Sequence, residues 1–212
     1  MHFRALLHLI GFLKNTSNKD LRFYCKIESS PLYQLLKSNK IQIIDDTVVT
    51  FTDSSWNDCV DPGRSIGCNL SLTQGATADY SSHLLVLVAI SSGEAEYISA
   101  AVACMKARHL RMLVYYDLRT MGSKSYDGDN LECEPSRIIV DNEAAISIAR
   151  YNKETTGNRH VPRRYHYVRQ GTTLKEHVFE WIGTKNQLAD MSTKSSNAIT
   201  FSPLWLFIQH EC

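Results

Sequence analysis

The stretch Thr47-Val-Val-Thr-Phe-Thr-Asp53, followed by Ser54-Ser55-Trp56, decides the fold because it predicts a β-strand that ends on an acid. The two valines are β-branched and Phe51 is aromatic, and such residues are enriched in strands. Because side chains alternate along a strand, Val49, Phe51 and Asp53 should share one face. Asp53 therefore ends a core-forming strand, where it either starts a turn or meets other carboxylates.

The composition is that of an ordinary globular protein. The chain has 212 residues, of which 43% are hydrophobic and 21% charged, and its formal net charge is +1. This length suffices for one good core, and the small net charge does not by itself indicate a polyanionic partner. Charge is uneven along the chain, because acids dominate between residues 117 and 143 and bases between residues 159 and 175.

The cysteines and the hydropathy pattern indicate an intracellular protein. The six cysteines form no C-x-x-C pair and show no zinc-ligand spacing, which favours a reducing setting. Cys68 falls in a strand pattern and Cys104 in a helical one, as buried small hydrophobic residues do. No apolar run approaches the roughly 18 residues that span a bilayer, so we expect no membrane partner.

Three strands are predicted between residues 41 and 90. The strand that ends at Asp53 is followed by alternating apolar residues over 66–72 and by the apolar run 84–90, which predicts a buried third strand. The short separations favour an antiparallel meander. Before these strands, residues 3–14 predict an amphipathic helix and the polar residues 29–40 a linker.

The second half of the chain alternates helices with strands. Ser91-Ser-Gly-Glu94 has the S-x-x-E pattern of a capping box and opens a long helix. After a polar loop over 117–135 come a strand over 137–141, a helix over 142–151, a basic stretch over 161–175 and a strand over 177–182. Thr184-Lys-Asn-Gln187 then predicts a second capping box. This order, βββαβα(α)βα, favours an α/β fold in which the later strands join the same sheet in parallel.

Four acids occupy comparable places in this order. Asp53 and Asp141 end strands, Glu94 opens a helix, and Asp190 lies one turn inside the last helix. Strand ends and helix N-termini can gather at one edge of a mixed sheet. Clustered carboxylates repel one another unless a cation lies among them, and Mg²⁺ suits a few carboxylates together with water and phosphate.

Each acid also has a structural interpretation, which the residues alone leave open. In this interpretation Glu94 has no role beyond closing its capping box, Asp141 has none beyond that of a helix N-cap, and Asp190 is an acid on the surface of a helix. We interpret Glu96 and Glu143 as solvated helix residues.

Five short motifs follow one another over residues 41–195. They are Phe51-Thr-Asp53-Ser-Ser-Trp56, Ser91-Ser-Gly-Glu94-Ala-Glu-Tyr97, Val140-Asp141-Asn142-Glu-Ala-Ala-Ile146, Arg159-His160 with Arg164-Tyr-His166-Tyr-Val-Arg169, and Asn186-Gln-Leu-Ala-Asp190 with Thr193-Lys194. Together they resemble the ribonuclease H (RNase H) domain of Ty1/copia-type retrotransposon polyproteins.

The resemblance implies a fold, an activity and a setting. The fold is RNase H-like, with helices packed on a five-stranded mixed sheet and an N-terminal helical extension. Residues 1–40 would be the end of the reverse transcriptase region and a linker, 41–195 the RNase H-like domain, and 196–212 a C-terminal tail. The activity is hydrolysis of the RNA strand of RNA–DNA hybrids during reverse transcription. The setting is a cytoplasmic particle or the nucleus, with the upstream reverse transcriptase of the same polyprotein as partner.

The resemblance also implies the site residues. The catalytic and metal-binding acids would be Asp53, Glu94, Asp141 and Asp190, around two Mg²⁺ ions, with Mn²⁺ as the alternative ion. We expect the phosphates to be contacted by Arg159, Arg163, Arg164 and Arg169, and a 2′-hydroxyl by Asn142. The alternative for the arginines is a solvated basic face.

Two other functions remain open on the sequence. One is a catalytically inactive RNase H-like module that binds nucleic acid or braces a polymerase, although a brace needs none of the four acids. The other is a nuclease or strand-transferase of the same superfamily, which would act on duplex DNA through three acids.

Overall fold

The computed structural model describes residues 14, 19–20, 22–59, 63–120, 134–150, 163–193 and 210–211. The helix predicted over residues 3–14 lies almost wholly outside them, as do Arg159 and most of the tail over 196–212. The division into three domains stays a prediction. No helix within the described ranges is long and apolar enough to cross a membrane.

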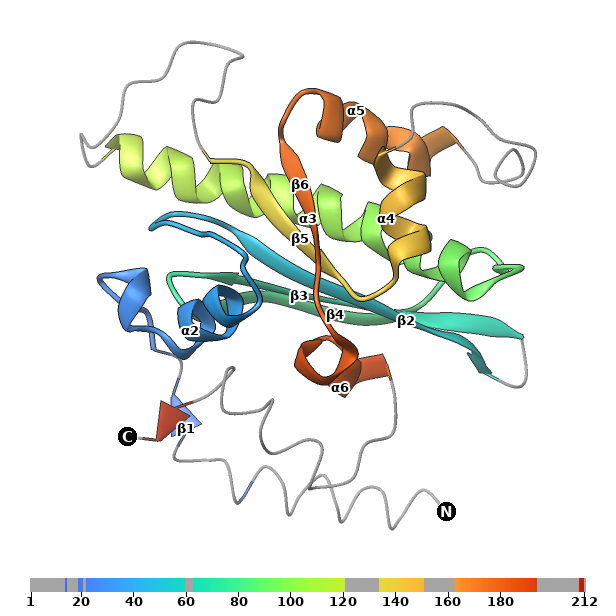
Figure 1. The fold of residues 1–212 in the computed structure, drawn as a ribbon, viewed down its shortest axis with the longest axis horizontal. Coiled ribbons are helices and arrows are strands. Elements are labelled where there is room, and N and C mark those ends of the chain that lie inside the picture. The colour runs from blue at the N-terminus through green and yellow to red at the C-terminus, as the bar shows by residue number, and fades with distance from the viewer. Residues whose placement is uncertain are drawn as a thin grey trace.

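A five-stranded mixed sheet forms the centre of the molecule (Figure 1). Its strands in chain order are β2 (Val49–Cys59), β3 (Arg64–Thr73), β4 (Ala76–Leu84), β5 (Ser136–Val140) and β6 (His177–Trp181). They lie in the order β4-β3-β2-β5-β6, with β2, β3 and β4 antiparallel and β5 parallel to both β2 and β6. This topology confirms the predicted RNase H-like α/β fold class. A separate two-stranded sheet joins β1 (Lys19–Asp20) to β7 (His210–Glu211).

Helices cover both faces of the central sheet (Figure 1). One face carries α3 (Ser92–Thr120), α4 (Glu143–Arg150), the 3₁₀ turn η2 (Arg163–His166) and α5 (Tyr167–Thr173). The other carries η1 (Ile27–Ser29), α2 (Pro31–Ser38), η3 (Thr184–Asn186) and α6 (Asp190–Thr193). Each layer has its own buried core. Val48 belongs to the first core and Val49 and Phe51 to the second, as strand alternation predicts.

The predicted third strand is wrong in position. The strand is β4, which ends at Leu84, so the rest of the apolar run, residues 85–90, lies beyond it, with Val86, Val88 and Ile90 exposed. The turn explains the shift: Gln74 and Gly75 both have positive φ, and Thr73 pairs with Ala76. Such a two-residue turn starts the return strand immediately, so the polar sequence after it is the part that pairs with β3.

Residues 29–40 are not a linker over most of their length. Ser30 accepts a hydrogen bond at 3.1 Å from the amide of Tyr33, Pro31 occupies the first turn, and α2 follows. Leu32 and Leu36, four residues apart, point into the second core. Residues 117–120, which the sequence predicts to belong to a loop over 117–135, are instead the last residues of α3, and residues 121–133 lie outside the described part of the chain.

Candidate active site

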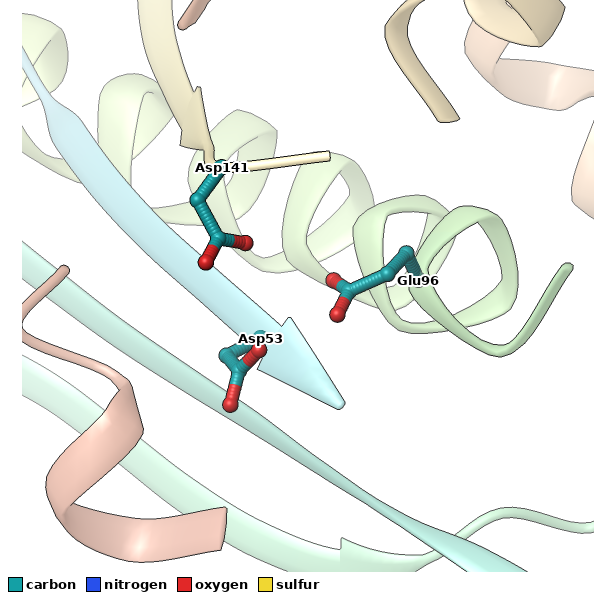
Figure 2. A group of neighbouring side chains, drawn as sticks. All are labelled: Asp53, Glu96 and Asp141. Atoms are coloured by element: carbon teal, nitrogen blue, oxygen red, sulfur yellow. The ribbon is translucent and has the colours of Figure 1, made fainter. Parts of the chain in front are cut away.

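Three carboxylates meet where β2, α3 and β5 come together. They belong to Asp53 on β2, Glu96 in the first turns of α3, and Asp141 directly after β5. One oxygen atom from each lies within 4.8 Å of the others. Figure 2 shows the three carboxyl groups pointing toward one another from three different elements.

The strand pairing explains why the two aspartates meet. β2 and β5 are parallel neighbours, and Phe51 lies opposite Ile139. Asp53 and Asp141 each follow these paired residues by two positions, so they lie close together where β5 ends. The prediction that Asp53 ends its strand is wrong, because β2 continues to Cys59 and Asp53 pairs with Cys68 of β3. The helix α3 is held against this edge by Ser99, whose hydroxyl bonds the hydroxyl of Thr52 and the carbonyl of Asp53, both at 3.0 Å.

Glu96 is buried next to another negative charge. Its exposed fraction is 5%, and that of Asp53 is 1%. Burial, and then the charge of Asp53, raise the pKa of Glu96 to about 10. The backbone amide of Ser54 donates to Oε1 of Glu96 at 3.2 Å, whereas Oε2 is buried without a hydrogen-bond partner. A buried carboxylate in this position is costly unless a cation accompanies it.

The donor set fits a hard divalent cation. Mg²⁺ and Mn²⁺ prefer carboxylate oxygens and retain several waters. Asp53, Glu96 and Asp141 offer such oxygens within 4.8 Å of one another. Oε2 of Glu96 is buried without a hydrogen-bond partner, and a bound cation would satisfy it. These three residues would hold the metal.

The carboxylates line an open cavity of about 720 Å³. Its other lining residues are Ser54, Ser55, Trp56, Ser92, Asn142, Glu143 and Ala144. Residues from β2, α3 and α4 therefore surround a space that can admit part of a polymer.

The structure does not bring Glu94, the predicted ligand, into this group. Its own amide donates to Oγ of Ser91 at 3.2 Å, so Ser91 caps α3 as the S-x-x-E pattern predicts, and its Oε2 accepts from the amide of Ile90, the residue before the cap, at 2.9 Å. The interpretation of Glu96 as a solvated helix residue is wrong. A signal was present in the sequence: three, four and seven residues after Glu96 come Ser99, Ala100 and Ala103, small residues typical of a helix face that packs closely.

Asp190 lies near the group but outside it. α6 begins at Asp190 rather than one turn earlier. The capping box predicted over 184–187 is absent, because Oγ1 of Thr184 donates to Oδ2 of Asp141 at 2.8 Å and Nε2 of Gln187 donates to the carbonyl of Thr52 at 3.1 Å. The metal-binding role of Asp190 stays a prediction.

Of the residues predicted to contact the substrate, one lines the cavity, one is buried, and the side chains of the other three are not described. Asn142 lines the cavity, but its Oδ1 accepts from the amides of Ala144 and Ala145 at 2.9 and 3.2 Å and so caps α4. Arg169 is only 7% exposed, and its Nε donates to the carbonyl of Ile148 at 3.3 Å, which favours a structural role over a phosphate contact. Arg159 and the side chains of Arg163 and Arg164 lie outside the described part of the chain.

No protein-family model matches the chain. Among solved structures, the chain is similar to the N-terminal RNase H domain of rv2228c from Mycobacterium tuberculosis, determined as a fusion with maltose-binding protein. The TM-score is 0.42 at 12% identity, over 75% of this chain and 96% of that one. This identity is too low to transfer residue roles from one chain to the other.

Proposed function

We propose that the chain is a divalent-metal-dependent ribonuclease that hydrolyses the RNA strand of RNA–DNA hybrids. The observation that carries this proposal is the group formed by Asp53, Glu96 and Asp141 at the wall of an open cavity. A binding or bracing module has no use for buried carboxylates that repel one another, and their burial lowers the stability of the metal-free fold.

The chain's own residues would position the metal site. Asp53, Glu96 and Asp141 would hold an ion, with Glu96 in the place that the resemblance gave to Glu94, and Asp190 would complete a second ion's site. Hydroxyl groups of Thr193 and Thr184 donate to the carboxylates of Asp53 and Asp141 and would fix their orientation. When bound, two Mg²⁺ ions would activate a water molecule and stabilise the leaving oxygen of a phosphodiester.

The substrate and the biological setting are supported by the five sequence motifs. They favour the hybrid formed in reverse transcription of a Ty1/copia-type element, with the upstream reverse transcriptase of the same polyprotein as partner and an intracellular particle or the nucleus as the setting. A hybrid duplex is recognised mainly through its shape and 2′-hydroxyl groups. We therefore expect contacts along its backbone rather than base-specific recognition.

Cleavage of an end-labelled RNA–DNA hybrid tests the proposal. We expect the wild-type chain to cut the RNA strand in Mg²⁺ and to leave it intact in EDTA. Asp141→Asn should abolish cutting while preserving the circular dichroism spectrum. Binding of the hybrid without cleavage under any divalent ion would instead identify an inactive nucleic-acid-binding module.

The number of acids in the group also supports a second candidate function, because only three of the described acids lie within 4.8 Å of one another. A nuclease or strand-transferase of the same superfamily would use three acids on duplex DNA. The cleavage assay should therefore include duplex DNA of the same sequence as a second substrate. Cleavage of that duplex in preference to the hybrid would replace the ribonuclease proposal with this one.

A further inference from the structure

Trp56 lies on the wall of the metal-site cavity. It follows Asp53 by three residues on β2, which places their Cα atoms about 10 Å apart, and it lines the same cavity as the three carboxylates. A side chain at this distance from the metal-binding group can contact a nucleotide next to the one that undergoes reaction.

An irregularity in the sheet allows Trp56 to leave the strand ladder. Ser55 pairs with Ile66, but the next pair along joins Cys59 to Arg64, so four steps on β2 correspond to two on β3. Bulges of this kind occur often beside active sites, where they redirect a side chain. Trp56 is the first residue of the unpaired stretch.

The indole is both anchored and exposed. Its Nε1 donates to the carbonyl of Ala89 at 3.1 Å, in the segment that connects β4 to α3. The residue nevertheless remains 50% exposed. Since the polar edge of the ring already has a partner, the exposed part is mainly an apolar surface held in a fixed orientation.

The charge of the cavity makes such a surface useful. The lining contains Glu143 as well as the three carboxylates of the metal-binding group. None of the ten residues that line the cavity is a lysine or an arginine. These ten residues would therefore attract phosphate through the metal alone, and they can contact the rest of the nucleotide through non-ionic groups. Trp56 is the one aromatic residue in this lining, and stacking on aromatic side chains is a common way to hold bases without regard to sequence.

We propose that Trp56 is a substrate-positioning residue whose indole packs against a nucleotide of the strand that enters the metal site. The proposal rests on the ribonuclease function argued above and adds to it a non-ionic contact that sets where the strand lies relative to the carboxylates.

Steady-state cleavage of the hybrid tests this role. Trp56→Ala should raise KM about tenfold or more, the effect expected from loss of one stacked base, while Trp56→Phe, which keeps an aromatic face, should stay closer to wild type. The dependence of KM on salt should be unchanged, because no ion pair is lost. Tyr80→Ala is the matched control, since Tyr80 is an exposed aromatic residue on β4 that does not line the cavity. An unchanged KM in Trp56→Ala would overturn the proposal.

A binding measurement separates this proposal from the ribonuclease function. In the Asp141→Asn variant, where the hybrid remains intact, tryptophan fluorescence should change saturably as hybrid is titrated in. Most of that change should disappear in the double variant that carries both Asp141→Asn and Trp56→Phe. If the fluorescence change persists in Trp56→Phe, the proposed contact is wrong even when cleavage is observed. If wild type cleaves nothing but the Trp56-dependent change is present, the contact stands and the ribonuclease function fails.

Discussion

Thr193 donates a hydrogen bond from Oγ1 to Oδ2 of Asp53, a residue 140 positions earlier in the chain. Asp53 is thereby held from both sides of the sheet, since Ser99 of α3 donates to its backbone carbonyl from the other layer. The position of the first carboxylate thus depends on the packing of both helical layers. The short helix α6 thus contacts the site through the hydroxyl group of Thr193.

Replacement of Thr193 by valine should impair cleavage without unfolding the chain. The variant keeps a similar shape but removes the donor that orients Asp53. Loss of such a supporting group typically costs ten- to hundred-fold in metal affinity or activity. We expect at least a tenfold lower cleavage rate for Thr193→Val at low Mg²⁺, and near wild-type activity for Thr193→Ser. Equal rates for the valine and serine variants would show that the hydrogen bond does not support the site.

Glu96 should make the metal-free fold sensitive to alkaline pH. Its pKa rises from 4.5 to about 10 on folding, so the native state binds the proton more tightly than the unfolded state. Its contribution to stability is fully present below about pH 4.5 and is lost as the pH rises toward 10. Metal-free Glu96→Gln should therefore have a higher Tm than wild type at about pH 8, and this difference should vanish in acid. A lower Tm for Glu96→Gln at alkaline pH would contradict the predicted cost of this carboxylate.

Mg²⁺ should stabilise the wild-type chain by binding the native state alone. Stabilisation of this kind grows with the ratio of free ion to Kd. Because binding must displace the proton from Glu96, the increase in Tm at fixed Mg²⁺ should become larger as the pH rises. Thermal melts with and without Mg²⁺ measure this directly. In Glu96→Gln the increase should be much smaller and should lose most of its pH dependence.

His177 should give the fold a second pH dependence, of opposite sign. It is 1% exposed, and neither ring nitrogen has a hydrogen-bond partner. Burial lowers its pKa from 6.5 to about 4, so its contribution to stability is present above pH 6.5 and is lost as the pH falls toward 4. His177→Leu should flatten the acid limb of the Tm profile between these values. The exposed His109 supplies a control, since His109→Leu should leave that limb in place.

The two aspartates of the site could be predicted because each comes directly after apolar strand residues of neighbouring strands, although Asp53 lies within β2 and not at its end. Glu96 could not be predicted by the same means. The S-x-x-E pattern correctly identifies Ser91 as the cap of α3, but it gives no information on which side of the helix meets the sheet. That side depends on the contact between Ser99 and Thr52, which is a matter of tertiary packing.

The strand boundaries show a similar limit. Apolar content alone favoured residues 84–90 as a strand, whereas the turn at Gln74 and Gly75 sets the register and so selects the polar segment that follows it. The resulting strand lies at the edge of the sheet, where polar side chains are tolerated on the exposed face. The apolar residues beyond it partly cover α3 instead.

The most direct test of the central claim compares Glu96→Gln with Glu94→Gln in Mg²⁺-dependent cleavage of an RNA–DNA hybrid. Both variants replace one buried acid of α3 with its amide, two residues apart. If the metal is held by Asp53, Glu96 and Asp141, Glu96→Gln should lose at least a thousandfold in rate, whereas Glu94→Gln should retain most of its activity with a modestly lower Tm. Full activity of Glu96→Gln together with loss of activity in Glu94→Gln would contradict this account of the site.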